Sequence, residues 1–400
     1  MYFHHPVCRA APNVALPKDN STPKRSIRMA EPASAPALET VGANPTRLWG
    51  LSMAERNHRI GVKAGLGGTG APVVLANADV AADPAWLRHV AARPGLVLTL
   101  GGVPAIGHAR DEHEAALLRD AMRGGAPPHE AERFAFEAYE DGAAIENRAL
   151  RKRERPFLMK LRPNTRRAAE RASYFGAYKG VTDLLTKYLW PEWALWLTRL
   201  AAWLGLSPNA VTAIGTALCI AATVAFAYGY YWIGLALGLV FMVLDTVDGK
   251  LARCTITSSK LGDVLDHGLD LIHPPFWWWF WATGLAHVGL ALSDTLFWWV
   301  EGSIFAGYLI QRAIEGAFIR WFGGIHIHVW ERFDSRFRLI TARRNPNMVI
   351  LFVAVLFGRP DIGIVAVAVW TVVSCAVHLI RLGQALARKR KGEPVRSWLA

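Results

Sequence analysis

Two long stretches of this chain contain no charged residue. Residues 200–244 and residues 271–293 lack Asp, Glu, Lys and Arg, although the chain carries a net charge of +13. A helix crosses the hydrocarbon core of a bilayer with about 20 apolar residues, so each stretch is long enough to span a membrane. Since 52% of the residues are hydrophobic and 17 are Trp, we predict a mainly α-helical, polytopic membrane protein.

Four aspartates lie between these stretches, spaced so that each pair shares one face of a helix. They belong to a pattern made of Asp245, Asp248, Gly249, Ala252, Arg253, Gly262, Asp266 and Asp270. Four carboxylates in one small volume repel one another, and divalent cations that prefer oxygen ligands, such as Mg²⁺, Mn²⁺ or Ca²⁺, relieve the repulsion. Ionisable groups at membrane helices are costly and usually functional. The pattern therefore predicts a metal site in preference to ordinary helix-end carboxylates.

The pattern resembles the signature of the CDP-alcohol phosphotransferase family, D-x2-D-G-x2-A-R followed by G-x3-D-x3-D. The resemblance covers residues 178–385. It implies transfer of a substituted phosphate from a CDP-linked alcohol to an acceptor alcohol, with release of CMP, in phospholipid or polar-lipid biosynthesis. It also implies two divalent cations, Mg²⁺ or Mn²⁺, held by Asp245, Asp248, Asp266 and Asp270, with Asp270 acting as general base as well.

Further binding residues follow from the same resemblance. Gly249, Ala252, Arg253 and Gly262 are expected to hold the CMP moiety, together with Asn209, for which a helix cap is the alternative. A basic element of the inositol-phosphate-type branch resembles Lys179 and Asp183, which hints at a polar, phosphorylated acceptor. Arg343 and Arg344 suit a phosphate-bearing acceptor, or else anchor the chain at the cytoplasmic membrane face.

Hydropathy and loop charge predict six membrane spans with both termini in the cytoplasm. The predicted spans cover residues 208–229, 231–250, 261–290 (broken at Pro274 and Pro275), 295–321, 346–358 and 361–380. Basic residues collect in the loops after the second, fourth and sixth spans, and basic loops stay cytoplasmic. The aspartates and the active site then face the cytoplasm, where nucleotide substrates are found, from the inner (cell) membrane.

The rest of the chain is predicted to form smaller parts. Residues 1–45 are rich in Pro, Ala, Ser and Asn and are expected to be disordered, with no signal peptide. Residues 46–155 alternate between strand and helix patterns, which predicts a small α/β domain that resembles a degenerate nucleotidyltransferase domain. Residues 156–205 are expected to form basic and interfacial helices, residues 206–385 the membrane domain, and residues 386–400 a basic tail. The glycines at 65, 67 and 70 fit a flexible turn better than a dinucleotide fingerprint.

Two other functions compete with the transferase. Intramembrane aspartates also mark the cation paths of ion-coupled transporters, but no inverted repeat is evident. A scaffold with an inactive transferase domain would not need the complete aspartate pattern. We expect a CDP-alcohol donor, an alcohol or phosphorylated alcohol acceptor, membrane lipid and a second copy of the chain as partners. No nucleic acid is expected, because no motif interleaves aromatics with the arginine clusters.

Overall fold

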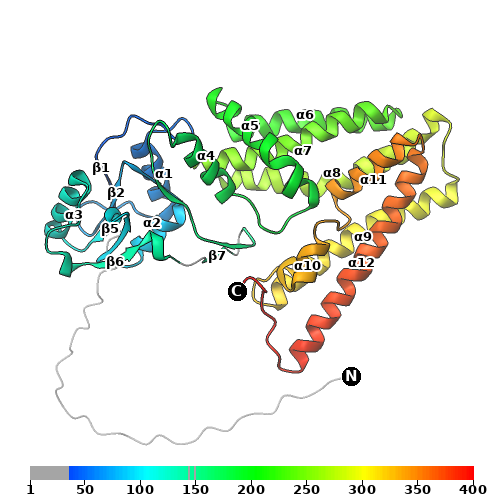
Figure 1. The fold of residues 1–400 in the computed structure, drawn as a ribbon. Helices are drawn as coiled ribbons and strands as arrows, with labels where there is room; N and C mark the ends of the chain where they lie inside the picture. Colours follow the sequence, from blue (N-terminus) through cyan, green and yellow to red (C-terminus); the bar gives the residue numbers. More distant parts are fainter. Residues whose placement is uncertain (1–35, 143–144, 148–149) are drawn as a thin grey trace, which may run out of the picture. The chain divides into compact units, whose positions relative to one another are not determined.

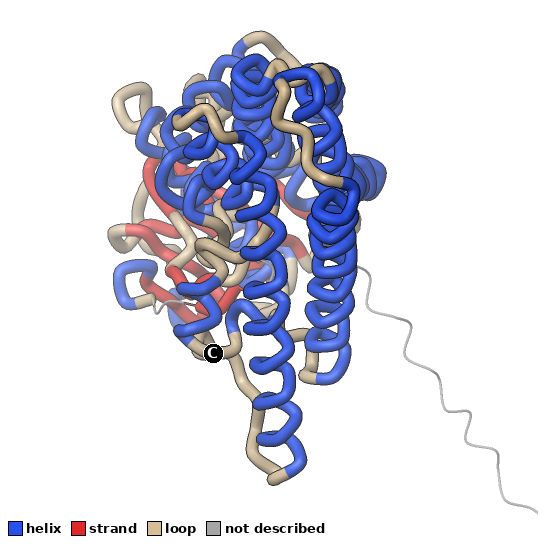
Figure 2. The backbone as a smooth tube through the Cα atoms, turned by 90° about the vertical axis from the view of Figure 1, so that its right-hand side faces the viewer, coloured by secondary structure: helices blue, strands red, loops and turns tan. Residues whose placement is uncertain are grey.

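The computed structural model describes residues 36–142, 145–147 and 150–400 (Figure 1). The side chains of residues 145–147, 260, 261, 263–267, 269 and 270 lie outside this description, so Asp266 and Asp270 are known here by their backbone alone. Strands are confined to the first part of the described chain, and helices make up nearly all of the remainder (Figure 2).

The α/β part is built on a mixed five-stranded sheet with the strand order β1-β2-β5-β4-β6. Its strands are β1 (Ala37–Val41), β2 (Val73–Asn77), β4 (Leu96–Leu100), β5 (Val103–Ala109) and β6 (Ala135–Ala138). β5 pairs antiparallel with both β2 and β4, while β1 and β6 run parallel to their neighbours. Two smaller ladders join β3 (Val80–Ala82) with β9 (Leu158–Lys160) and β7 (Ile145–Asn147) with β8 (Lys152–Glu154).

Helices cover both faces of this sheet because successive strand residues point to opposite sides. α1 (Met53–Ala64) and α2 (Pro84–Ala91) pack Ile60, Trp86 and Leu87 against one face, in a cluster that includes Val74 and Leu98. α3 (Glu112–Gly124) packs against the other face, where Val73, Leu75 and Val97 form a second cluster with Leu118. The predicted α/β organisation is confirmed. Asp83 caps α2, whose first residue is Pro84.

The expectation that residues 1–45 are disordered is wrong for their last part. Residues 37–41 form β1, which pairs in parallel with β2 from Ala37 opposite Val73 to Val41 opposite Asn77. The preceding residues are rich in Pro and Ala, so their composition did not predict this short strand. β1 is stabilised by pairing with β2, which is distant in sequence. Gly65 caps α1 with a left-handed backbone (φ 76°) and opens no helix, in agreement with the predicted turn.

The helical part begins with α4 and contains the predicted spans. Its helices are α4 (Arg166–Gly176), α5 (Trp190–Trp203), α6 (Pro208–Ala227), α7 (Tyr231–Cys254), α8 (Lys260–Gly284), α9 (Asp294–Trp321), α10 (Arg332–Phe337), α11 (Arg344–Leu356) and α12 (Pro360–Arg390). Short turns of π- or 3₁₀-helix, η3 (Leu185–Leu189), η4 (Leu285–Val288) and η5 (Ile327–Val329), connect some of them, while η1 (Ala131–Arg133) and η2 (Tyr139–Asp141) lie in the α/β part.

Two predicted boundaries need correction. α8 continues through Pro274 and Pro275, where a break was expected. A proline pair removes two backbone donors, but neighbouring helices can hold such a helix in place. α12 ends at Arg390, well beyond the predicted end of the sixth span at residue 380, because its last turns are basic but still helical.

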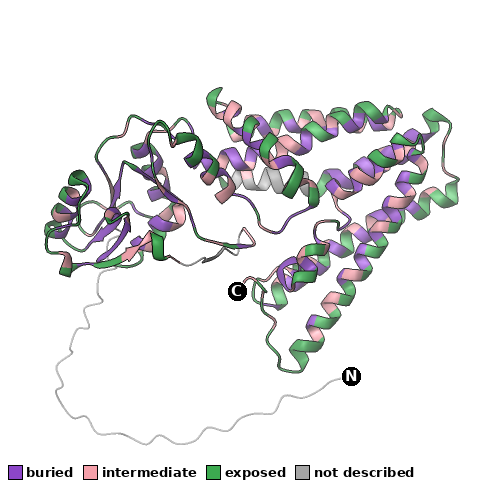
Figure 3. Cartoon of the chain, viewed as in Figure 1, coloured by how far each residue is buried: buried purple, intermediate pink, exposed green. Residues whose placement is uncertain are grey.

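α6, α7 and α12 are long and apolar enough to cross a membrane, and α11 is a shorter apolar helix. Each long helix buries one stripe and exposes the other (Figure 3). The buried stripes meet in a core that includes Phe226, Tyr231, Trp277 and Trp281. The hydroxyl of Tyr231 donates to the carbonyl of Trp281 (3.0 Å), which ties the start of α7 to α8. The chain is therefore an integral membrane protein.

Candidate active site

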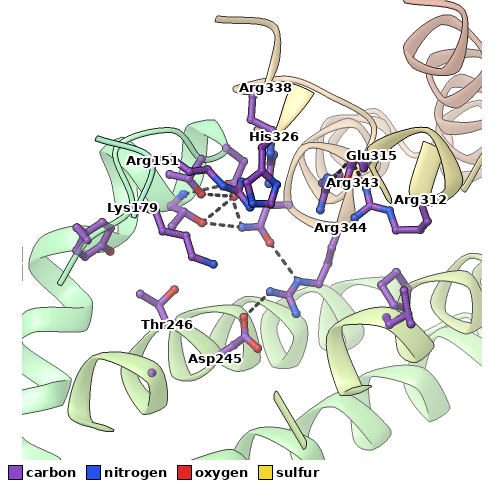
Figure 4. A pocket seen from close by; sticks show the side chains of 18 of the residues that line it. Arg151, Lys179, Asp245, Thr246, Arg312, Glu315, His326, Arg338, Arg343 and Arg344 are labelled. Carbon is purple, nitrogen blue, oxygen red and sulfur yellow. Dashed lines mark hydrogen bonds and ion pairs between the residues drawn. The ribbon is translucent and has the colours of Figure 1, made fainter. Parts of the chain in front are cut away.

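A cavity of about 510 Å³ lies beside the predicted aspartate pattern (Figure 4). One side, here called the motif side, is formed by Asp245, Thr246, Gly249, Lys250 and Arg253 of α7 with Leu271 and Pro274 of α8. The other, here called the basic side, includes Arg151, Lys179, Arg312, His326, Arg338, Arg343 and Arg344. Of the described charged residues in its wall, eight are Arg or Lys and only Asp183, Asp245 and Glu315 are acidic. The cavity is therefore suited to an anionic ligand.

α7 positions the first two aspartates one turn apart. The helix is unbroken from Tyr231 to Cys254, so Asp245 and Gly249 share the face that lines the cavity. Asp248 is 4% exposed, and its Oδ2 atom accepts a hydrogen bond from the Thr212 hydroxyl of α6 (2.6 Å). This contact fixes the Asp248 carboxylate at the junction of the two helices.

The N-termini of α6 and α8 meet at Gly262. Ser207 caps α6 and Ser259 caps α8, each hydroxyl accepting from a backbone N–H of the first turn. A Cβ atom placed on Gly262 would lie 3.4 Å from Oδ1 of Asn209 and 3.2 Å from Oγ of Ser259. Glycine thus permits the close approach that brings Asn209 to the second half of the pattern.

Helix α1 of the α/β part holds the end of α7 and the turn that follows. Arg56 donates to the carbonyl of Cys254 (3.0 Å) and Arg59 donates to that of Thr255 (2.9 Å). Lys63, on the same face of α1, donates to the carbonyl of Ser258 (2.9 Å). Helix C-termini leave carbonyls without partners and carry a partial negative charge, so three cationic donors stabilise this end. The connection between α7 and α8 is thereby anchored.

Arg344 joins the two sides of the cavity. Its Nη2 atom lies 2.6 Å from Oδ2 of Asp245, and both side chains are largely buried, at 12% and 13% exposure. Figure 4 shows Arg344 reaching from the first turn of α11 to the motif side. The guanidinium balances the Asp245 charge.

Glu315 neutralises part of the basic side. Its Oε1 atom accepts from Arg312 (2.8 Å), from Arg343 and from the His328 ring (3.1 Å). The Glu315 side chain is 14% exposed. Charge-assisted bonds of this kind fix the guanidinium groups in place, so Arg343 is held with a defined orientation beside the cavity.

Asp183 lies in the wall with both carboxylate oxygens in use. Oδ1 accepts from the Thr186 backbone N–H (3.0 Å) and from the Asn345 amide (3.0 Å), and Oδ2 accepts from the Thr186 hydroxyl (2.8 Å). Burial raises the pKa of Asp183, but the charge of Arg338 and these hydrogen bonds outweigh it, so the pKa lies below its usual value. Asp183 therefore connects the residues before α5 to α11.

Arg338 is a buried cation behind this network. Burial and the charge of Arg343 lower the pKa of Arg338 to about 9, which leaves it protonated at neutral pH. Its Nε and Nη1 atoms are buried and have no hydrogen-bond partner among the described residues. The local field is therefore strongly positive.

The structure brings together most of the sequence-predicted residues. Lys179, Asp183, Asp245, Gly249, Arg253, Arg343 and Arg344 line the cavity. Within the described part of the chain, Asn209, Asp248, Ala252 and Gly262 lie outside the cavity wall. The side chains of Asp266 and Asp270 fall outside the described residues, although the α8 backbone runs through both positions.

Sequence reasoning missed several residues of the basic side. Arg151, Arg312, Glu315 and Arg338 line the cavity although none of them was predicted as a site residue. A signal was present: Arg312 and Glu315 are three residues apart within an apolar helix, where such a pair requires a polar environment.

The donors on α7 fit a divalent cation. Asp245 and Asp248 supply hard oxygen atoms one turn apart, and Asp245 lies in the cavity wall. Such ligands suit Mg²⁺ or Mn²⁺. Among the residues whose side chains are described, no group of three or more His, Cys, Asp or Glu is placed to hold a metal ion.

Comparison with known proteins gives the family. The model of CDP-alcohol phosphatidyltransferase matches residues 205–333. Cholinephosphotransferase 1 of Gallus gallus is 42% identical over 106 residues, 24% of this chain and 31% of the relative. The chain thus spans less than a third of that relative's length. Archaetidylinositol phosphate synthase of Pyrococcus horikoshii is 30% identical over 170 residues, 42% of this chain and 78% of the relative.

Among solved structures, the apo form of phosphatidylinositol phosphate synthase of Mycobacterium tuberculosis is similar with a TM-score of 0.37 and 19% identity, covering 46% of this chain and 94% of that chain. The archaeal synthase is matched over most of its length, and the family model includes all four aspartates of the pattern. The chain therefore belongs to the CDP-alcohol phosphatidyltransferase family.

Proposed function

We propose that this protein transfers a substituted phosphate group from a CDP-linked alcohol to an acceptor alcohol and releases CMP. The observation that carries the proposal is the cavity in which Asp245, Gly249 and Arg253 face a cluster of cations. Both substrates of such a reaction present oxygen-rich groups, and both need to be held close together.

The motif side binds the donor. Gly249 leaves room against the α7 backbone, and Arg253, one turn further on, is exposed and available to phosphate oxygens. Ala252 of α7, with Asn209 and Gly262 in the first turns of α6 and α8, completes the CMP site in this proposal. Gly262 lies close to Oδ1 of Asn209, which joins α6 to the aspartate pattern. This proximity supports the assignment of Asn209 to the CMP site.

Asp245, Asp248, Asp266 and Asp270 hold two divalent cations, Mg²⁺ or Mn²⁺, in this proposal. When bound, the cations stabilise charge on the phosphoryl oxygens and on the leaving CMP. Asp270 takes the proton from the attacking hydroxyl of the acceptor. Leu271 and Pro274 follow position 270 on α8 and line the cavity, which supports placing the general base at this helix turn.

The basic side binds the acceptor. Lys179, Arg343 and Arg344 surround a volume with more cations than described carboxylates, which favours an acceptor that itself carries a phosphate. Asp183 lines the same volume, and its hydrogen bonds to Thr186 and Asn345 give it a positioning role. A neutral acceptor alcohol would leave the excess positive charge without a partner.

We propose further that α8, α9 and α11 complete six spans with α6, α7 and α12. The cavity and both termini then face the cytoplasm, and the inner membrane is the expected location. Exposed Trp193, Trp196 and Trp203 of α5 suit the membrane interface. The small residues Gly302, Ala306, Ala313 and Gly316 share an exposed face of α9, which suits packing against a second copy.

We propose that the α/β part has no transferase activity of its own. Its contacts through Arg56, Arg59 and Lys63 support a structural role at the α7–α8 connection. The resemblance to a degenerate nucleotidyltransferase domain is consistent with a lost nucleotide activity.

The test is CMP release by the purified protein in detergent. CDP-diacylglycerol and CDP-inositol serve as donors, each with a panel of neutral alcohols and alcohol phosphates. We expect CMP only when donor, acceptor and Mg²⁺ or Mn²⁺ are all present, and faster release with a phosphorylated acceptor. Absence of CMP with every pair, from protein shown to be folded, would contradict a transferase function.

A further inference from the structure

Arg151 enters the cavity from outside the helical part. It immediately precedes β8, in the small β7–β8 ladder, and it lies well before residues 205–333, which the family model matches. It nevertheless lines the same cavity as Asp245 and Arg343. The recognised family domain therefore does not contain the whole wall of the cavity.

The backbone around Arg151 is held tightly. The N–H of Gly180 donates to the carbonyl of Leu150 (2.8 Å), and the Lys152 ammonium donates to the carbonyls of Phe175 (3.1 Å) and Gly176 (2.8 Å). A Cβ atom on Gly180 would lie 2.6 Å from the Arg151 carbonyl oxygen and 2.5 Å from Cβ of Lys152. Only glycine allows this approach, so the position of Arg151 depends on the segment that also carries Lys179.

Arg151 adopts a left-handed backbone, with φ of 51°. For a residue with a side chain this conformation is strained, and glycine or asparagine would adopt it more readily. The hydrogen bonds and the close approach of Gly180 described above hold Arg151 in this conformation. The Arg151 side chain is in the cavity wall, where a long cation can reach a ligand.

The surroundings of the guanidinium are predominantly positive. Its Nε atom is buried without a hydrogen-bond partner among the described residues. Burial and the charge of Arg343 lower the pKa of Arg151 to about 10, while Glu315 opposes the shift, so the group stays cationic at neutral pH. Burial and the charge of Arg151 likewise lower the pKa of His326 to about 4, so the ring is neutral. Cations that line one cavity repel one another unless an anion is bound between them.

The positive charge of Arg151 lies on the basic side of the cavity, where the acceptor is proposed to bind. Figure 4 shows Arg151 close to His326 and apart from Asp245 and Thr246, with Lys179 between. A group held by Arg151 is therefore bound on the basic side of the cavity, while Asp245 belongs to the motif side. A phosphate monoester offers several oxygens to more than one cation, which matches Arg151 and Arg343 better than a single-charge ligand does.

Resting on the transferase function proposed above, we infer that Arg151 is a specificity-determining residue that binds the phosphate monoester of the acceptor. The region before the family domain thus contributes directly to substrate recognition. The phosphate belongs either to a soluble alcohol phosphate or to a lipid headgroup such as phosphatidic acid, and the same side chain would bind both.

Binding of inorganic phosphate to the full-length protein in detergent tests the inference without relying on catalysis. Arg151→Gln keeps most of the length and removes the charge, and we expect phosphate to bind roughly 10- to 100-fold more weakly, the loss typical of one charge-assisted hydrogen bond. Arg151→Lys should recover part of the affinity. The exposed neighbour Arg153→Gln is the matched control and should bind phosphate like the wild type. Equal phosphate affinity in the Arg151→Gln and Arg153→Gln proteins would overturn the inference.

Kinetics then separate this inference from the proposed function. With an alcohol phosphate as acceptor, Arg151→Gln should raise the acceptor KM by a similar factor and leave the donor KM unchanged. CMP release with an unchanged acceptor KM would refute the role of Arg151 and retain the transferase. Arg151-dependent phosphate binding without CMP release from any substrate pair would support the phosphate site and refute the transferase.

Vesicles containing phosphatidic acid identify the source of the phosphate. Where Arg151→Gln weakens the binding of inorganic phosphate, a parallel loss of binding to these vesicles with unchanged affinity for glycerol phosphate identifies a lipid headgroup as the ligand. The reverse result identifies a soluble alcohol phosphate. If the Arg151→Gln protein does not fold, Arg151→Met, which also removes the charge, takes its place. Phosphate binding weaker than in Arg153→Gln then supports the inference, and wild-type phosphate affinity overturns it.

Discussion

The motif side of the cavity comes from one continuous part of the chain, residues 245–274 on two consecutive helices, whereas the basic side takes residues from positions as distant as 151 and 344. The first is specified by local spacing, because a helix places residues three and four apart on one face. The second is assembled by packing, from a hairpin, the start of η3, α9 and the residues around α10. In the proposed function, the residues of the chemical step are therefore local in sequence, and those that bind the acceptor are not.

The largest effect is expected from removal of the divalent cations, which tests the motif side alone. Excess EDTA should reduce CMP release to background, because the aspartates would have no cations to balance their charge at the transferred phosphate. Restoring Mg²⁺ or Mn²⁺ should restore activity, and Ca²⁺ is a useful comparison. Full CMP release in the presence of the chelator would show that the motif side works without metal.

Two aspartate variants should then differ from each other. Asp270→Asn should lower kcat by roughly 100- to 10,000-fold, as expected for loss of a general base, while part of the metal affinity survives. Asp245→Asn should weaken metal binding outright. Turnover and Mn²⁺ affinity are measured for both variants; an identical loss of the two quantities in both would make Asp270 an ordinary ligand.

The basic side should respond through KM rather than kcat. Arg343→Gln removes one cation held by Glu315 and should raise the KM for a phosphorylated acceptor by about 10- to 100-fold, the effect of one charge-assisted hydrogen bond. Mn²⁺ affinity should stay at the wild-type value. Exposed Arg123, on α3 of the α/β part, provides the control as Arg123→Gln. A loss of Mn²⁺ affinity in Arg343→Gln would mean that the two sides do not act separately.

A smaller effect is expected for Arg56 of α1, which anchors the connection between α7 and α8 next to the motif side. Arg56 is 1% exposed and donates to the carbonyls of Cys254 (3.0 Å) and Ala82 (3.4 Å). Arg56→Ala should lower the free energy of unfolding by about 2–4 kcal/mol, because charged hydrogen bonds and packing are both lost. Thermal unfolding in detergent measures this, with Arg123→Ala as control; equal stability of the two variants would exclude an anchoring role.

The smallest effect concerns residues 1–34. The described cavity wall contains none of them, and their composition is poor in residues that build a core. Removing them should change kcat/KM by less than about twofold, within the range of surface changes. The truncation must stop before Ala37, since β1 pairs with β2. A folded protein that loses CMP release on this truncation would contradict the expectation.

Prediction from the sequence was most accurate where the signal was periodic. The α/β organisation and the apolar helices α6, α7 and α12 were anticipated from spacing and composition. β1 was missed because five residues in a Pro- and Ala-rich context carry little pattern. The continuity of α8 through Pro274 and Pro275 was missed because a helix interior can tolerate proline only with the support of its neighbours.

The sequence by itself determined the family and the aspartate pattern, because all the residues involved lie within a few helical turns of one another and their spacing is preserved by the helix. Only the tertiary structure placed Arg151 in the same cavity wall as Arg343 and joined Arg344 to Asp245, since these residues are distant in the chain and no local periodicity relates them. A lone arginine in a sequence is compatible with a solvated surface, a headgroup contact or a binding site. Burial, a neighbouring charge and the backbone that holds it decide among these, and all three arise from packing.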